Sequence, residues 1–91
     1  MSIMKITMDQ MRANIKPIEI PTNLRTATEG IEYIIREVDT DDEEMEAFLF
    51  SLGCYSGEPI TVISHLRGGH IVSIKESRYT IDHQLAEAIL I

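Results

Sequence analysis

The sequence predicts a mainly β fold: a small closed barrel of about five strands, one short helix inserted at about residues 41–52, and a helical turn before the last strand. Three observations lead to this prediction. Short β-rich segments follow one another after Gly30, turn residues separate them, and one stretch has the apolar periodicity of a helix. Closing the sheet also removes exposed strand edges.

The strands are predicted from β-rich, partly alternating segments and from the turns between them. Gly68 and Gly69 predict a tight hairpin turn over Arg67–His70, because paired glycines supply the positive φ angles of two-residue hairpins. Asp82 is expected to cap a helical turn over residues 82–87. The strands are expected at residues 31–38, 59–66, 70–75, 78–81 and 88–91.

Sequence signals predict both ends of the inserted helix. Thr40 and Glu43 have the spacing of a capping box, in which each side chain satisfies a free backbone donor of the first turn. Gly53 stands where a left-handed residue ends a helix. Between them one apolar stripe follows the positions i, i+3, i+4 and i+7, and it consists of Met45, Phe48, Leu49 and Leu52.

Composition limits the classes of function. The chain has 91 residues and a formal charge of -7, with four basic and twelve acidic side chains in residues 31–91. This is the wrong sign for a nucleic-acid surface, and it fits either a solvated acidic face or one that meets a basic partner. The single cysteine, Cys54, excludes an internal disulfide. With no apolar run of about 20 residues, we expect a soluble cytoplasmic protein with no direct membrane insertion.

The organisation is asymmetric, with an extension at residues 1–23 and a domain at residues 24–91. Pro17 and Pro21 indicate a linker at about 17–23. Apolar residues before it, four of which share one helical stripe, fit a short amphipathic helix or a strand. The extension would then be a docking surface, a packed segment, or a homodimer contact through residues 1–20. The stripe consists of Met4, Met8, Met11 and Ile15.

The domain resembles the FeoA family, the ferrous iron transport protein A family, over roughly residues 24–91. The resemblance rests on glycines and core aliphatics in order and spacing. The segment Leu24-x-x-Ala27-x-x-Gly30 is similar to the lead into the family's first strand. The remaining matches are Leu49-Phe-Ser-Leu-Gly53-x-x-x-Gly57, Pro59-Ile-x-Val62, Ile71-x-Ser-Ile74, Tyr79-x-Ile81 and Leu85-Ala-x-x-Ile89-x-Ile91.

The resemblance implies an SH3-like barrel and a non-catalytic cytoplasmic accessory of bacterial ferrous iron uptake. Its implied partner is FeoB, a membrane permease with an N-terminal GTPase domain, and its implied action is docking. The alternative is a free-standing SH3-like regulatory module, related to the C-terminal domain of iron-dependent repressors.

A docking groove is expected between the loop Cys54–Glu58, the hairpin tip Arg67–His70 and the exposed side of the helix. Phe50 lies about 140° around the helix from Met45, away from the apolar stripe. Its ring is therefore either an outward binding anchor or packed under the extension or a second subunit. The expected partner-binding residues are Phe50, Tyr55, Glu58, Arg67 and His70.

Metal and catalytic sites have weaker support in the sequence. His65 and His70 flank the hairpin turn and are the candidate ligands for Fe²⁺ or Zn²⁺. No spaced His/Glu or Cys/His motif accompanies them, and acidic residues before a helix are favoured by its dipole alone, so we expect no cofactor. Cys54 lacks a positioned base, and its acidic surroundings would raise its pKa, so we expect no enzyme activity.

Overall fold

The computed structural model describes residues 22–91, which contain six strands, one 3-10 helix and two α-helices. The expected stripe, linker prolines and dimer contact at residues 1–21 lie outside this range. Asn23 already forms a β-bridge to Leu90, so the domain's packing includes this residue. The elements are η1 (Leu24–Thr26), β1 (Glu32–Ile34), β2 (Glu37–Val38), α2 (Glu43–Leu52), β3 (Pro59–His65), β4 (His70–Ile74), β5 (Ser77–Ile81), α3 (His83–Ala88) and β6 (Ile89–Leu90).

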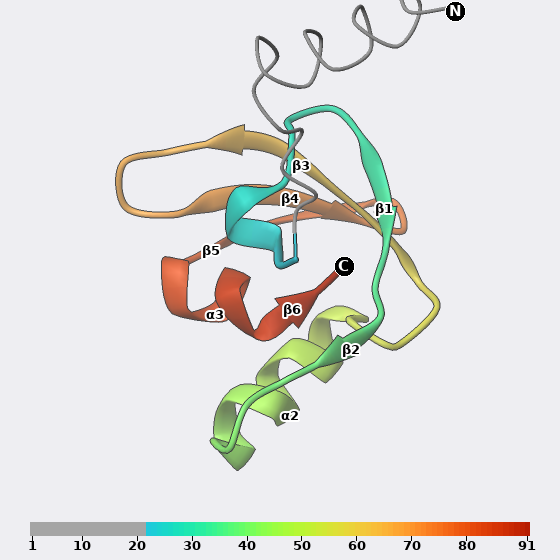
Figure 1. The fold of residues 1–91 in the computed structure, drawn as a ribbon, viewed down its shortest axis with the longest axis vertical. Coiled ribbons are helices and arrows are strands. Elements are labelled where there is room, and N and C mark those ends of the chain that lie inside the picture. The colour runs from blue at the N-terminus through green and yellow to red at the C-terminus, as the bar shows by residue number, and fades with distance from the viewer. Residues whose placement is uncertain (1–21) are drawn as a thin grey trace, which may run out of the picture.

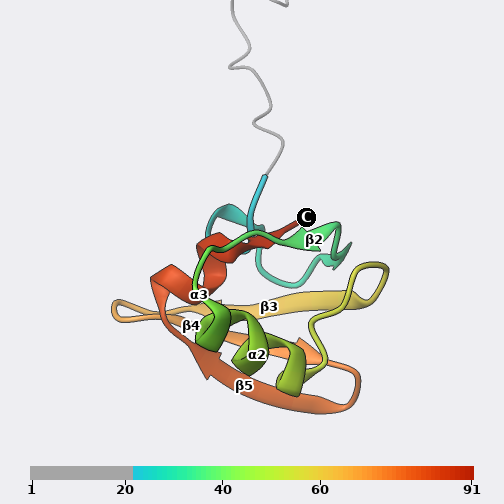
Figure 2. The ribbon, with the colours of Figure 1, turned by 90° about the horizontal axis from the view of Figure 1, so that it is seen from below.

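The strands form two antiparallel sheets, which confirms a mainly β fold. A four-stranded sheet has the order β1-β3-β4-β5, and β2 pairs with β6 in a separate two-stranded sheet. In Figure 1 the four-stranded sheet lies at one end of the domain, β2 and α2 lie at the other end, and α3 and β6 lie between them. The β3–β4 hairpin and the β4–β5 turn project at opposite ends of the sheet (Figure 2).

The segment predicted as one strand over residues 31–38 is divided between the two sheets. Ile35 donates its backbone N–H to the Glu58 carbonyl at 2.9 Å, whereas Arg36 donates to the Leu90 carbonyl at 2.7 Å. The hydrogen-bond partner therefore changes from the β3 side to β6 within one residue. Ile35 is buried at this change of direction, while Ile34 is 55% exposed.

The core lies between the two sheets and the helices. Alternate residues of β3 and β4 face it, as the strand period requires. The alternation in β3 ends at a register shift between Val62 and Ser64, which is a β-bulge or irregularity. Thirteen apolar residues within the described range form one buried cluster, and the largest of its side chains are Leu24, Ile35, Leu49, Ile60, Ile74, Ile81 and Ile89.

Helix α2 begins at Glu43, and its N-cap is Asp42, so the predicted Thr40–Glu43 capping box is wrong. The Asp42 carboxylate accepts backbone N–H groups from Glu44 at 2.9 Å and Met45 at 3.2 Å. A charged acceptor that reaches two free donors is stronger than a hydroxyl, so the helix begins directly after Asp42. Thr40 instead accepts the N–H of Asp42.

The C-terminal end of α2 agrees with the sequence, but one residue of its stripe does not. Gly53 is left-handed with φ 101°, as predicted, and donates to the last carbonyls of the helix. Leu49 is completely buried, whereas Phe48 is 46% exposed. The buried line of the helix therefore follows Met45, Leu49 and Leu52, which pack in or against the core cluster.

The β3–β4 hairpin forms where it was predicted, but for a different reason. Neither Gly68 nor Gly69 has a positive φ angle. A Cβ atom on Gly69 would lie 2.4 Å from the Ile81 carbonyl oxygen, so glycine is required by close approach of the neighbouring strand. In the next turn Lys75 adopts φ 57°, which places that turn one residue before the predicted Glu76–Ser77.

Helix α3 confirms its predicted cap and leads directly into β6. The Asp82 carboxylate accepts the N–H of Leu85 at 2.8 Å. On the other side α3 lies against η1, and Arg25 pairs with Glu87 at 3.4 Å across that contact. Neither α-helix in residues 22–91 has the length and apolarity needed to cross a bilayer.

Candidate functional site

A stacked aromatic pair joins the last turns of α2 to the loop that follows it. The Phe50 and Tyr55 ring centroids lie 5.3 Å apart with planes 12° from parallel. Tyr55 is 48% exposed, and Phe50 is half-buried beneath it. The Phe50 ring, which lies off the predicted helix stripe, is thus partly covered by a residue five positions along the chain.

The loop that carries Tyr55 is held by hydrogen bonds to the segment between β1 and β2. Gly57 donates its N–H to the Ile35 carbonyl at 2.7 Å, and the Ser56 hydroxyl donates to the Arg36 carbonyl. Glu58 closes the loop by donating its N–H to the Tyr55 carbonyl at 3.0 Å. The backbone of the Tyr55 loop is therefore held against the neighbouring segment, and the Tyr55 ring stacks on Phe50.

Cys54 lies at the base of this loop and belongs to the core. Its side chain is fully buried, and its N–H donates to the Leu49 carbonyl at 3.1 Å. Burial raises the pKa of the Cys54 thiol to about 11, because the thiolate would lose its hydration. A thiol that stays protonated at neutral pH behaves as a small apolar side chain.

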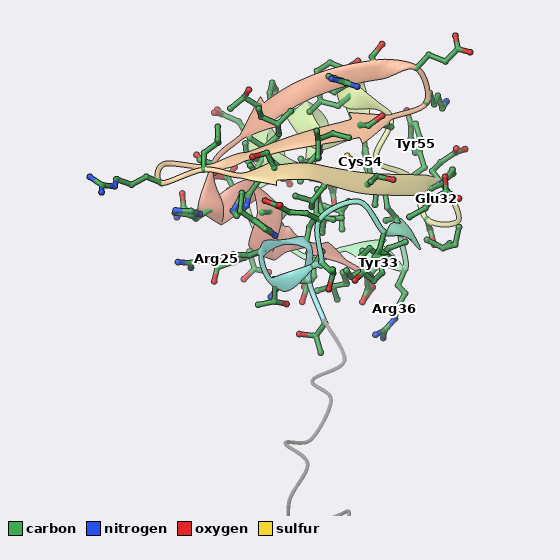
Figure 3. All side chains as sticks on the ribbon, turned by 90° about the horizontal axis from the view of Figure 1, so that it is seen from above. Arg25, Glu32, Tyr33, Arg36, Cys54 and Tyr55 are labelled. Carbon is green, nitrogen blue, oxygen red and sulfur yellow. The ribbon has the colours of Figure 1, made fainter. Side chains whose placement is uncertain are left out.

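The two loops that were expected to form the groove lie at opposite ends of β3. The loop Cys54–Glu58 precedes this strand and the hairpin tip follows it, so seven residues at about 3.3 Å each separate them by roughly 23 Å. Figure 3 likewise shows Tyr55 away from the hairpin end of the sheet. Arg67 is exposed at the tip, whereas His70 is only 2% exposed and offers no open surface for a partner.

At the base of the hairpin three histidine rings lie end to end. His65 and His70 face each other through their Nδ1 atoms at 2.7 Å, and the His70 Nε2 meets the His83 Nδ1 at 2.9 Å. The outer nitrogens meet backbone carbonyls: His65 Nε2 lies 2.6 Å from the Ala27 oxygen, and His83 Nε2 lies 3.0 Å from the Arg67 oxygen. We call this arrangement the histidine chain.

The sequence indicated that His65 and His70 lie near each other, but it did not indicate that His83 joins them. The strand register pairs His65 with His70, which the flanking positions around the turn had indicated. His83 follows the Asp82 cap, and nothing in the local pattern places α3 against the hairpin. Both nitrogens of His70 face other rings, and within residues 22–91 no group of three or more His, Cys, Asp or Glu side chains is arranged to hold a metal ion.

The acidic residues before and within the first turn of α2 serve the helix. Asp42 caps it, and three glutamates in the first turn complement the positive end of the helix dipole. These side chains are exposed, apart from the half-buried Glu46. The charged face therefore belongs to α2, on the same helix that presents Phe50.

These features define a class of protein: a small antiparallel β domain with an SH3-like fold. A stacked aromatic pair lies on its surface. A family model for the FeoA domain matches residues 22–91, so the chain belongs to the FeoA domain family. This membership indicates a role in ferrous iron transport. A comparison with curated proteins found no match.

Solved structures of low identity share the fold. A crystal structure described as an iron uptake regulatory protein (FeoA) has a TM-score of 0.68 and 24% identity, covering 78% of this chain and 92% of that one. The zinc complex of Stenotrophomonas maltophilia FeoA, described as an SH3 domain protein, has a TM-score of 0.68 and 13% identity, covering 76% and 88%. A manganese-dependent transcriptional repressor has a TM-score of 0.69 and 18% identity, covering 82% of this chain but 44% of that one.

Proposed function

We propose that this chain is a non-catalytic accessory protein of bacterial ferrous iron uptake that acts in the cytoplasm by docking on a FeoB-type GTPase/permease. Membership of the FeoA family supports the pathway. The stacked pair of Phe50 and Tyr55 is the observation that supports docking, because it is accessible, rigidly held and built from residue types that dominate binding energy.

The surroundings of the pair indicate the chemistry of the partner surface. Helix α2 carries three glutamates in its first turn and no basic residue in its last. Glu58 adds a partly exposed carboxylate at the end of the Tyr55 loop. An apolar or aromatic pocket with a basic rim would match this surface in shape and in charge. Arg67 lies at the other end of β3, so any contribution from it is a second, separate contact.

Binding to the purified permease tests this proposal, with full-length permease and its isolated GTPase domain immobilised separately. The full chain should bind at least one of them, and Tyr55→Ala should weaken binding about tenfold or more, as expected for a central aromatic anchor. Leu66→Ala is the matched control, since Leu66 is 44% exposed but lies at the far end of β3. Equal loss in both variants, or no binding to either form, would overturn the proposal.

Phe50→Ser provides an independent reading of the same surface. Because Phe50 is only half-buried, we expect the variant to remain folded and to bind more weakly. Circular dichroism and urea unfolding measure the first point, and the binding assay measures the second. A large loss of stability with unchanged affinity of the folded fraction would instead make Phe50 a core residue.

A regulatory module is the second candidate, and one observation favours it. The same fold forms part of longer manganese-dependent transcriptional repressors, where this chain matches 44% and 37% of the two structures compared. Deleting the gene separates the two functions. Docking predicts altered ferrous iron uptake at an unchanged permease transcript level, whereas regulation predicts that the transcript level itself changes.

A further inference from the structure

The histidine chain forms an unbroken line of hydrogen bonds between two fixed acceptors. Its four contacts run from the Ala27 carbonyl through His65, His70 and His83 to the Arg67 carbonyl, with lengths from 2.6 to 3.0 Å. At each contact one hydrogen must lie between the two heavy atoms. Two bare acceptors, or two N–H groups, facing each other at these distances would repel.

Counting hydrogens gives the protonation state of the closed chain. Backbone carbonyls only accept, so the outer nitrogens of His65 and His83 must both donate. Four contacts therefore need four N–H hydrogens. Three neutral imidazole rings carry three, because each has one donor and one acceptor nitrogen. All four hydrogen bonds form at once only when the three rings together hold one additional proton.

We propose that His65, His70 and His83 form a single proton-binding site that holds one proton beyond the neutral state and thereby fastens the hairpin base to η1 and α3. Removing this proton leaves one contact with two acceptors. Adding a second leaves one contact with two donors. The site is therefore closed in one charge state, +1, and opens toward both higher and lower pH.

The surroundings favour a single charge over two. The pKa of His70 is lowered, first because burial removes water from the ring, and then because His65, His83 and Arg25 repel a positive charge there, while Asp82 acts in the opposite direction. The lowered pKa of His70 thus disfavours a second positive charge on the central ring. Five charged residues surround the site. Glu29 accepts the backbone N–H of His65 at 2.6 Å, and the carbonyl of Arg67 accepts from His83 at the end of the histidine chain. The others are Asp82 and the ion pair of Arg25 with Glu87.

Proton linkage converts this count into a pH profile. In the unfolded chain, three independent histidines with the ordinary pKa of about 6.5 bind one proton in total at about pH 6.8. Above that pH the folded chain holds more protons than the unfolded one, so stability falls as pH rises. Below it the unfolded chain holds up to three, so stability falls as pH drops. The histidine contribution therefore has a maximum at about pH 6.8.

Nitrogen-15 NMR of the imidazole rings in the full chain counts the hydrogens directly. At pH 6.8 we expect four of the six ring nitrogens to carry hydrogen, with all three rings changing together when the pH is raised. Three protonated nitrogens at this pH, or three rings that titrate independently, would overturn the proposal.

Unfolding by urea between pH 5.5 and 8.5 gives a second test. For the wild-type chain the folding equilibrium constant should fall from its maximum by about twentyfold at pH 5.5 and by up to about fifteenfold at pH 8.5. In His83→Ala the histidine chain ends at the His70 Nε2, which can then accept a hydrogen bond from water. The two remaining contacts need only two N–H hydrogens, so two neutral rings satisfy them. Its equilibrium constant should rise about twofold between pH 6.8 and 8.5.

Gln84→Ala is the matched control, because Gln84 is exposed on the same helix and makes no contact in the histidine chain. It should keep the wild-type shape of the profile even if its overall stability differs. The shape, not the level, is the readout, so general destabilisation by His83→Ala does not affect the result. A fall toward pH 8.5 in His83→Ala equal to that in the wild type would refute the single-proton site.

Discussion

The substitution Gly69→Ala should destabilise the domain because of one close approach between strands. The added Cβ would lie 2.4 Å from the Ile81 carbonyl oxygen, 3.3 Å from the Ile81 carbonyl carbon and 3.5 Å from the Asp82 Cα. All three are backbone atoms at the end of β5, where His70 pairs with Ile81, so no side chain can move aside. Overpacking of this kind costs about 1–3 kcal/mol, and occasionally more.

Gly68→Ala isolates this steric cost. A Cβ at Gly68 meets nothing within 4 Å, and neither glycine has a positive φ angle. Both substitutions stiffen the unfolded chain by a similar amount, about 0.4–1 kcal/mol, so this contribution cancels in the difference between them. Urea unfolding followed by circular dichroism should therefore show Gly69→Ala about 1–3 kcal/mol less stable than Gly68→Ala. Equal stability of the two variants would refute the close-approach explanation.

Two further predictions concern the ends of α2. Asp42→Ala should lower the free energy of unfolding by about 0.5–2 kcal/mol, and Thr40→Ala by clearly less, because only Asp42 accepts two N–H groups of the first turn. A larger loss for Thr40→Ala in urea unfolding would instead identify Thr40 as the N-cap. Burial raises the pKa of the Cys54 thiol to about 11, so the unfolded thiol releases its proton first and wild-type stability should fall above about pH 9, by about 2–3 kcal/mol at pH 11. Parallel pH profiles for the wild type and Cys54→Ala would contradict this assignment.

The features that were predicted correctly depend on neighbours in sequence. The Gly53 stop of α2 and the Asp82 cap of α3 each depend on a few adjacent residues, and the position of the hairpin between β3 and β4 was visible from its local turn residues. The strands predicted at residues 59–66 and 70–75 also form, as β3 (Pro59–His65) and β4 (His70–Ile74), because alternating β-rich segments are typical of a strand with one buried face. Such local patterns are visible without knowledge of the partner strands.

The features that were missed depend on partners far along the chain. The break between β1 and β2 arises because Arg36 bonds to Leu90, more than fifty residues away. Gly69 is required by the backbone of Ile81, and the exposure of Phe48 follows from which side of α2 meets the sheet. These contacts join residues that are at least twelve positions apart, so no pattern within ten residues contains them.

The candidate sites show the same division. Tyr55 covers Phe50 through a turn that the sequence marks with Gly53, so the stacked pair involves only neighbouring residues. The expected groove instead joined two loops that lie at opposite ends of β3. His83 completes the histidine chain only because α3 packs beside the hairpin base, which is a tertiary fact.

The affinity of the full chain for a FeoB-type permease in lipid nanodiscs, measured by titration calorimetry, tests the docking proposal most directly. We predict saturable binding of the wild type, at least about tenfold weaker binding of Tyr55→Ala, and unchanged binding of Leu66→Ala. A permease that binds the wild type and Tyr55→Ala equally well would contradict docking through the aromatic pair. A permease that binds neither would contradict docking on FeoB altogether.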